Sequence, residues 1–217
     1  MNEFLHFTRS AKIKRSGFLH QHLQKKQFLR SEGETEMLKR YLHAPAHLLI
    51  DDSSYFITGA IHRKRPLLNS PELIFGLLEL FQGYFDKHGW KLHHWVILNN
   101  HYHLMGKSRK GKDLPVIIRN AHRVSARVIH KATGCQKPVW QNYWDYCPRN
   151  EKEYMTRANY LMFNPVRHGY VRNLRDYPFS GFHKLYTERG RDVLVKRFQE
   201  YPDYKTFVLH EAKEDDF

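Results

Sequence analysis

The stretch WVILNNHYHLMGKS, residues 95–108, decides the fold that the sequence predicts. Apolar residues lie on both sides of Asn99-Asn100, a dipeptide suited to the tight turn between two antiparallel strands. We therefore predict a β-hairpin with strands over residues 90–98 and 101–107. A strand of this kind is a rigid support for functional side chains.

The second strand of this hairpin carries two histidines at alternate positions. His101 and His103 are two residues apart, so both imidazoles lie on one face of the strand and Tyr102 lies on the other. Both rings can therefore approach one metal ion. The chain contains sixteen histidines, however, and a pair of this kind also arises by chance, with satisfied or exposed side chains.

The segments around the hairpin predict helices and one more strand. We expect a strand over residues 55–60 and helices over 71–87, 114–133 and 151–163, the second of which Gly134 ends. The third helix is expected to stop before Asn164-Pro165, because the residue before a proline disfavours helical geometry. No element is assigned to the aromatic stretch 139–146. The fold class is α+β: a mostly antiparallel sheet, with the histidine pair on a central strand and helices packed on it.

Composition indicates a basic protein with a polyanionic partner. The 217 residues include 36 Lys or Arg and 22 Asp or Glu, a formal net charge of +14. Lysine and arginine that neutralise phosphates release condensed counterions, so this balance favours nucleic acid without identifying an activity. The two cysteines form no CxxC motif, and no apolar run is long enough for a membrane span. We expect a cytoplasmic protein in a reducing compartment, with no membrane partner.

Basic residues are concentrated after the hairpin. Between residues 107 and 131 there are eight Lys or Arg and one Asp. Three of the arginines recur every four residues and share one face of the expected helix. As candidate DNA-binding residues we take Lys107, Lys110, Arg119, Arg123 and Arg127. A solvated helix face is the alternative for such a charge stripe.

The sequence NYLMFNPVRHGYV supplies a second group of candidate residues. Tyr160 and Asn164 are four apart, so they lie on one face of a helix and can reach the same point in space. One of these side chains could act as a nucleophile while the other completes the set of ligands around a metal ion. A half-buried aromatic residue is the alternative reading of this tyrosine. Tyr154 lies six residues earlier, about 240° around the helix, so the two tyrosines do not share a face.

These motifs together resemble the HUH superfamily of single-strand DNA nucleases. The chain resembles more closely the REP-associated tyrosine transposases, which are allied to small insertion-sequence transposases with one tyrosine. The resemblance rests on WVILNNHYHLMGKS, on YLMFNPVRHGYV and on DYPFSG at residues 176–181, in a consistent order over residues 48–186. Two departures from the family pattern are Asn99, where proline is common, and Tyr102, where a small aliphatic residue is common.

The resemblance implies a fold, a mechanism and a set of roles. It implies a ferredoxin-like or RRM-like core, with His101, His103 and Asn164 as metal ligands and Tyr160 as nucleophile. It further implies Mg²⁺ or Mn²⁺ as cofactor, a 5′-phosphotyrosine intermediate, and single-stranded DNA with a hairpin or palindromic repeat as partner. Two imidazole ligands suit Mn²⁺ better than Mg²⁺. Either a monomer or a homodimer is compatible with the sequence.

The resemblance also divides the chain into three parts. We expect a basic N-terminal extension over residues 1–47, a catalytic domain over 48–186 and a C-terminal extension over 187–217. Three other functions are alternatives for this sequence. The first is a rolling-circle initiator, but many of these have two tyrosines four apart on one helix, and this chain lacks the second tyrosine. The second is a zinc hydrolase, but the chain has no HExxH motif. The third alternative is a domesticated protein that binds a DNA hairpin without cleaving it.

Overall fold

A computed structural model describes residues 49–209 of the chain. The expected N-terminal extension, residues 1–47, and the last residues of the expected C-terminal extension therefore lie outside the described residues. Within the described range, no helix is both long and apolar enough to cross a membrane.

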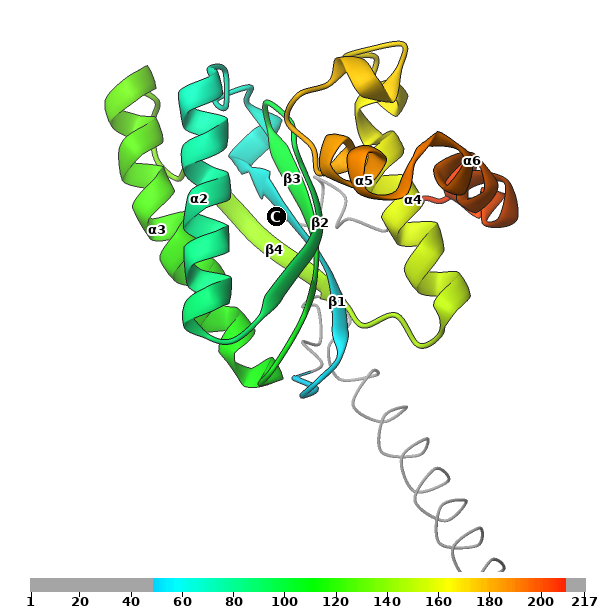
Figure 1. Cartoon of the computed structure of the whole chain (residues 1–217). Coiled ribbons are helices and arrows are strands. Elements are labelled where there is room, and N and C mark those ends of the chain that lie inside the picture. The colour runs from blue at the N-terminus through cyan, green and yellow to red at the C-terminus, as the bar shows by residue number, and fades with distance from the viewer. Residues whose placement is uncertain (1–48, 210–217) are drawn as a thin grey trace, which may run out of the picture. The chain divides into compact units, whose positions relative to one another are not determined.

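A four-stranded antiparallel sheet lies at the centre of the fold (Figure 1). Its strands are β1 (Ser54–Ile61), β2 (Lys91–Ile97), β3 (His101–Lys107) and β4 (Trp140–Tyr146), in the spatial order β2-β3-β1-β4. Helix α2 (Pro71–Lys87) connects β1 to β2, and α3 (Leu114–Thr133) connects β3 to β4. This βαββαβ order is ferredoxin-like, and it confirms the α+β prediction and the central position of the histidine strand.

Two groups of helices cover the two faces of the sheet (Figure 1). Helices α2 and α3 pack on one face. Helix α4 (Glu151–Arg167) lies on the other, followed by α5 (Phe182–Arg189) and α6 (Arg191–Glu200). The α6 residue Leu194 and the following Tyr204 belong to the same buried cluster as Phe56 of β1 and Val96 of β2. Residues beyond 186 thus contribute to the core of this second layer.

The helix ends follow the sequence signals in most places. Ser70 caps α2 by accepting a hydrogen bond from the Leu73 amide at 3.4 Å, and Pro71 occupies the first helical position. Gly134 ends α3 with φ of 65°, a left-handed conformation that glycine adopts without a Cβ clash. The hairpin also forms as predicted, with β2 and β3 joined through Asn99 and Asn100.

Two sequence predictions need correction. Helix α4 does not stop at residue 163; it continues through Pro165 to Arg167. Proline removes one amide donor and only disfavours the residue before it, and the His168 amide still donates to the Asn164 carbonyl at 3.0 Å. The aromatic stretch left unassigned forms β4, which pairs with β1. Tyr143, Trp144 and Tyr146 there have the strand preference of aromatic residues.

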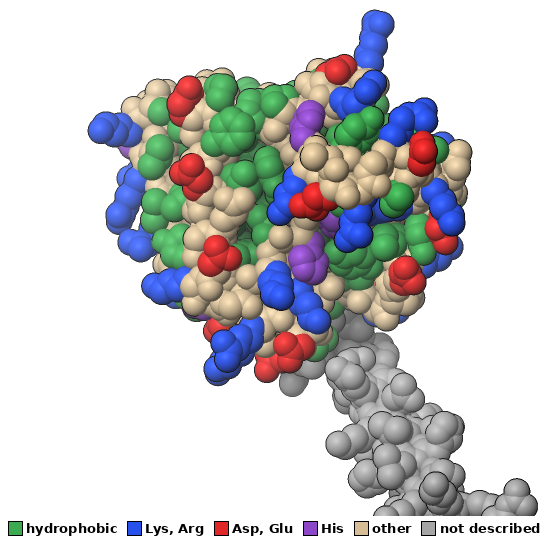
Figure 2. All heavy atoms as spheres, viewed as in Figure 1, with side chains coloured by type: hydrophobic (Ala, Val, Ile, Leu, Met, Phe, Trp, Pro, Cys, Tyr) green, Lys and Arg blue, Asp and Glu red, His purple; other side chains and the backbone are tan. Residues whose placement is uncertain are grey.

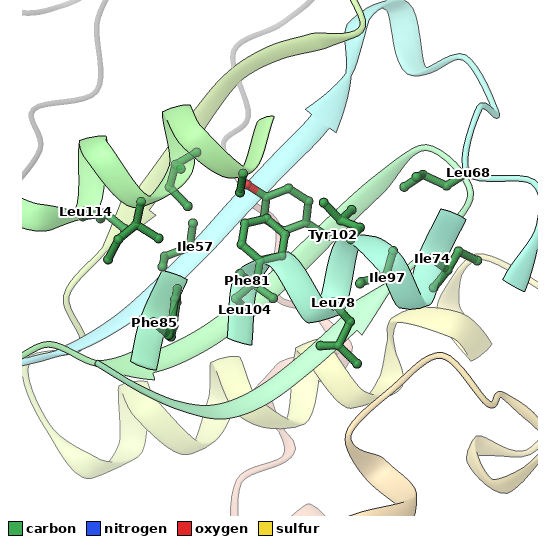
Figure 3. Close-up of a cluster of buried hydrophobic side chains, with 14 of the residues drawn as sticks. Ile57, Leu68, Ile74, Leu78, Phe81, Phe85, Ile97, Tyr102, Leu104 and Leu114 are labelled. Carbon is green, nitrogen blue, oxygen red and sulfur yellow. The ribbon is translucent and has the colours of Figure 1, made fainter. Parts of the chain in front are cut away.

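The core beneath α2 and α3 fixes the orientation of the histidine strand. Figure 3 shows Tyr102 among the buried side chains of this cluster, beside Phe81, and the two ring centroids are 4.6 Å apart. The Tyr102 hydroxyl lies 2.9 Å from Nε2 of His122 on α3. Because Tyr102 is anchored on this face, strand alternation turns His101 and His103 toward the α4 layer.

Gly59 is required where Tyr102 crosses β1, and its replacement by alanine is expected to destabilise the protein. A Cβ at this position would overlap the Tyr102 ring, whereas a Cβ on Gly76 of α2 would meet no atom within 4 Å. We expect Gly59→Ala to cost about 1–3 kcal/mol of overpacking. Gly76→Ala should instead gain about 0.5–1 kcal/mol, since glycine is a poor helix former. Denaturant unfolding measures both, and equal stabilities of the two variants would contradict this packing role.

Candidate functional site

The three predicted metal ligands meet between β3 and α4. Nε2 of His101 lies 3.1 Å from Oδ1 of Asn164, and Nε2 of His103 lies 3.3 Å from Nδ2 of the same amide. The two imidazole centroids are 5.0 Å apart. Two ligand atoms that are each about 2.0–2.2 Å from one ion lie about 3–3.6 Å apart, so the 3.1 Å between Nε2 of His101 and Oδ1 of Asn164 fits a shared cation.

A second set of contacts orients both imidazoles. The Asn100 amide donates from Nδ2 to the Lys64 carbonyl at 3.1 Å, which leaves its Oδ1 facing Nδ1 of His101 at 2.6 Å. This oxygen accepts a hydrogen bond in the tautomer that carries the ring proton on Nδ1, and in that tautomer the lone pair of Nε2 is directed at Asn164. On the other ligand, Nδ1 of His103 lies 2.8 Å from Oγ1 of Thr58.

Burial keeps both imidazoles neutral. Desolvation lowers the pKa of His101 to about 4, with the charge of His168 acting in the same direction. Desolvation also lowers the pKa of His103 well below its usual range, since that ring is fully buried. A neutral imidazole retains the lone pair that a metal ion needs, so both rings are in the ligand form at neutral pH.

The donor set fits a divalent cation. In the tautomer with the His101 proton on Nδ1, Nε2 of His101 offers a lone pair beside Oδ1 of Asn164, and a divalent ion would take both atoms as ligands. No group of three His, Cys, Asp or Glu side chains in residues 49–209 could hold a metal ion. The third donor at the proposed site is the amide oxygen of Asn164, so the site is not a group of that kind. Two nitrogen donors and one oxygen donor suit Mn²⁺ better than Mg²⁺.

Tyr160 lies beside these ligands, one helical turn before Asn164. Its ring is almost fully buried and meets the His103 ring edge to face, with centroids 5.5 Å apart. Phe207 packs on it at 5.2 Å, and the Arg167 guanidinium carbon is 5.5 Å from its centroid. The four candidate residues that the sequence assigned to metal and nucleophile are thus in one place.

Other residues at this site were not identified from the sequence. His168 lies with its ring centroid 5.2 Å from that of His101, and Arg167 approaches Tyr160. Both follow Pro165, where the predicted helix stopped, so their place on the same helical face as Asn164 was missed. Asn100 was read as a turn residue only. The pairing of Thr58 with His103 requires the strand register, which sequence patterns do not supply.

The predicted DNA-binding residues lie away from this group. Arg119, Arg123 and Arg127 are exposed on α3, which packs on the opposite face of the sheet from α4. Lys107 ends β3 at the end farthest from His101, and Lys110 follows it. Figure 2 shows Lys and Arg side chains along the α3 edge and also over the α5 and α6 side. The role of these five residues in DNA binding stays a prediction.

Removing the contacts that orient the imidazoles is expected to weaken metal binding. Asn100→Ala and Thr58→Val each delete a partner of a ligand imidazole, and such partners are typically worth about 10–100-fold in metal affinity. Thr58→Ser keeps the hydroxyl and should keep the affinity. Asn99→Ala is the matched control for Asn100, because the Asn99 side chain contacts Tyr170 and not His101. Calorimetric titration with Mn²⁺ measures this, and wild-type affinity in both deletions would contradict the orienting role.

Comparisons with known proteins relate the chain to one family of transposases. The family model described as "Transposase IS200 like" matches residues 51–160, about half of the chain. A REP-associated tyrosine transposase of Escherichia coli (strain K12) is 34% identical over 91 residues, which cover 42% of this chain and 53% of that protein. A putative REP-associated tyrosine transposase of Haemophilus influenzae is 38% identical over 47 residues, 21% of this chain and 27% of that protein. The matches thus span about half the length, or less, of these curated relatives.

A solved structure is similar over a larger part of the chain. It is a REP-associated tyrosine transposase bound to a REP hairpin, with a TM-score of 0.55 and 26% identity, and the match covers 69% of this chain and 87% of that one. The range matched by the family model includes both histidines and ends at Tyr160. The chain therefore belongs to the IS200-like transposase family, and its predicted resemblance to the REP-associated tyrosine transposases is confirmed.

Proposed function

We propose that this protein is a metal-dependent DNA strand transferase that nicks and rejoins single-stranded DNA through one tyrosine. One observation carries the proposal: His101, His103 and Asn164 converge within hydrogen-bonding distance, and Tyr160 packs against them from the same helical face as Asn164. A nucleophile and a set of metal ligands in contact are what transesterification at a phosphodiester requires.

The proposed reaction assigns one role to each side chain. Oη of Tyr160 attacks the phosphorus, and the bond from phosphorus to the 3′-oxygen breaks. The phenol gives up its proton and the leaving 3′-oxygen takes one up, so the products are a 5′-phosphotyrosine and a 3′-hydroxyl. A divalent ion on the three ligands would polarise the scissile phosphate. Arg167 places a cation beside the Tyr160 ring.

Rejoining is the same step in reverse. The phosphate ester bond is conserved in the link to Tyr160, so the 3′-hydroxyl of another strand can attack the phosphotyrosine and release the phenol without ATP. One nucleophile is sufficient for this exchange. The position of Tyr154 supports a single tyrosine, because its hydroxyl lies 3.2 Å from Nδ1 of His93 on β2, and its ring lies beside His94.

The proposed substrate is a DNA hairpin with single-stranded flanks. The similar solved structure is bound to a REP hairpin, and the curated relatives are named REP-associated. The net charge of +14 supports a polyanionic partner. The arginines on α3 are exposed, and within the described residues none forms an ion pair, which leaves them available for phosphates of the hairpin.

A nicking assay with matched substrates tests the proposal. An end-labelled hairpin with single-stranded flanks should be nicked in the presence of Mn²⁺ or Mg²⁺ and not in EDTA. The same sequence as a perfect duplex should be cut far more slowly, because one tyrosine reaching one phosphate has no means of separating paired strands. Equal cleavage of the duplex would contradict the substrate assignment. Tight hairpin binding without nicking would indicate the binding-only alternative.

A further inference from the structure

The strand register places an indole in the same row of the sheet as a proposed metal ligand. Thr58 of β1 pairs with His103 on one side and with Trp144 of β4 on the other. Directly paired residues of antiparallel strands have their side chains on the same face. Trp144 therefore lies on the face that carries both histidines, two strands or about 10 Å from His103.

Trp144 differs from the tryptophans that serve the core. Trp90 donates from its indole to the Lys110 carbonyl, and Trp140 donates to Ser125 and stacks on His122. Trp144 is only partly buried, and within residues 49–209 its indole has neither a hydrogen bond nor a ring partner. The contacts among the described residues therefore give this indole no role in stabilising the fold.

The surroundings of Trp144 are aromatic and basic. Tyr146 lies two residues along β4 on the same face, and the Arg157 guanidinium carbon is 3.7 Å from the centroid of its ring. Arg157 is on α4, three residues before Tyr160, so this cation and the nucleophile lie on neighbouring positions of one helix face. Within the described residues β4 is an edge strand of the sheet.

We propose that Trp144 is the stacking surface for a base of the single strand, next to the phosphate that Tyr160 attacks. This inference rests on the proposed function and adds to it the residue that positions the nucleobase. Every base has a π-face, so such a contact is tolerant of sequence, and the neighbouring Arg157 supplies a cation for the backbone. A divalent ion on His101, His103 and Asn164 would hold the phosphate, while Trp144 fixes the nucleotide beside it.

Binding to two oligonucleotides of equal charge isolates the stacking contribution. One is a thymidine oligonucleotide of about 16 nucleotides, and the other is an abasic strand of the same length. The wild-type protein should bind the thymidine strand more tightly. Trp144→Leu should lower the ratio of the two affinities about tenfold, equivalent to ~1.4 kcal/mol, with little change in affinity for the abasic strand. Trp144→Phe should retain most of the ratio.

Phe75→Leu is the matched control, since Phe75 is 43% exposed on α2 in the opposite helix layer. Its ratio should equal that of the wild type. A wild-type ratio in Trp144→Leu, or a wild-type protein that does not distinguish the two strands, overturns the inference. Either outcome would still allow a covalent adduct on Tyr160. Failure of the stacking contact can therefore be distinguished from failure of the proposed function.

Photo-crosslinking tests the same contact in the unaltered protein. A single strand that carries 5-iodouracil crosslinks on irradiation to an aromatic side chain stacked on the modified base. Peptide mass mapping should find the crosslink on Trp144. Crosslinks confined to other residues would refute the assignment even if the leucine variant does not fold.

Discussion

Tyr160→Phe is expected to reduce nicking of a flanked hairpin by at least about 10³–10⁴-fold, to the background of the assay. The variant removes only the attacking oxygen, and loss of a nucleophile has effects of this order in enzymes that form covalent intermediates. The aromatic ring remains, so its contacts with His103, Phe56 and Phe207 should persist. Hairpin affinity should therefore be close to that of the wild type, as a gel-shift titration can measure.

Tyr154→Phe is the control for this prediction. It removes a hydroxyl from the same helix, but that hydroxyl contacts His93 and not the proposed ligands. Single-turnover nicking by this variant should stay near the wild-type rate. A loss in Tyr154→Phe equal to that in Tyr160→Phe would show that the hydroxyl at 160 has no special role.

His101→Ala and His103→Ala are each expected to abolish metal-dependent nicking. Either change deletes a nitrogen donor, and the two remaining donors hold a divalent ion weakly. The loss of phosphate polarisation should cost at least about 10²–10³-fold in rate, as for the removal of other electrostatic contributions to a transition state. DNA binding should be largely kept, because phosphate contacts elsewhere on a basic protein dominate affinity.

A histidine outside the site provides the control. His88 follows α2, in the opposite helix layer, and its Nδ1 lies 3.3 Å from an Asp113 carboxylate oxygen. His88→Ala should bind Mn²⁺ and nick DNA like the wild type. Wild-type nicking by both site variants in the presence of EDTA would show that no metal on these residues takes part.

The parts of the fold that local patterns specify were predictable from the sequence. The tight Asn-Asn turn, the Ser70 cap and Gly134 act over a few residues, and the corresponding elements form where expected. The ligand face of β3 followed from strand alternation alone. The site as a whole was inferred because Tyr160 and Asn164 are spaced by one helical turn and because two separate motifs resembled one family.

The features that were missed depend on tertiary structure or on exceptions to local rules. A proline within α4 was read as its end, so Arg167 and His168 were not placed at the site. Trp144 shares a face of the sheet with His101 and His103 only through the pairing of β4 with β1, which no pattern within residues 139–146 reveals. The spacing of the arginines on α3 defined a face of that helix, but not which side of the sheet the helix would cover.

The identity of the amino acid that carries DNA after cleavage tests the proposed mechanism most directly. A flanked hairpin incubated with the protein and Mn²⁺ is digested with protease, and the nucleotide-bearing peptide is mapped by tandem mass spectrometry. The proposed mechanism predicts a 5′-phosphotyrosine at Tyr160 and none in Tyr160→Phe. An adduct on Tyr154 or Tyr102, an adduct that persists in Tyr160→Phe, or nicked DNA with no covalent protein would contradict it.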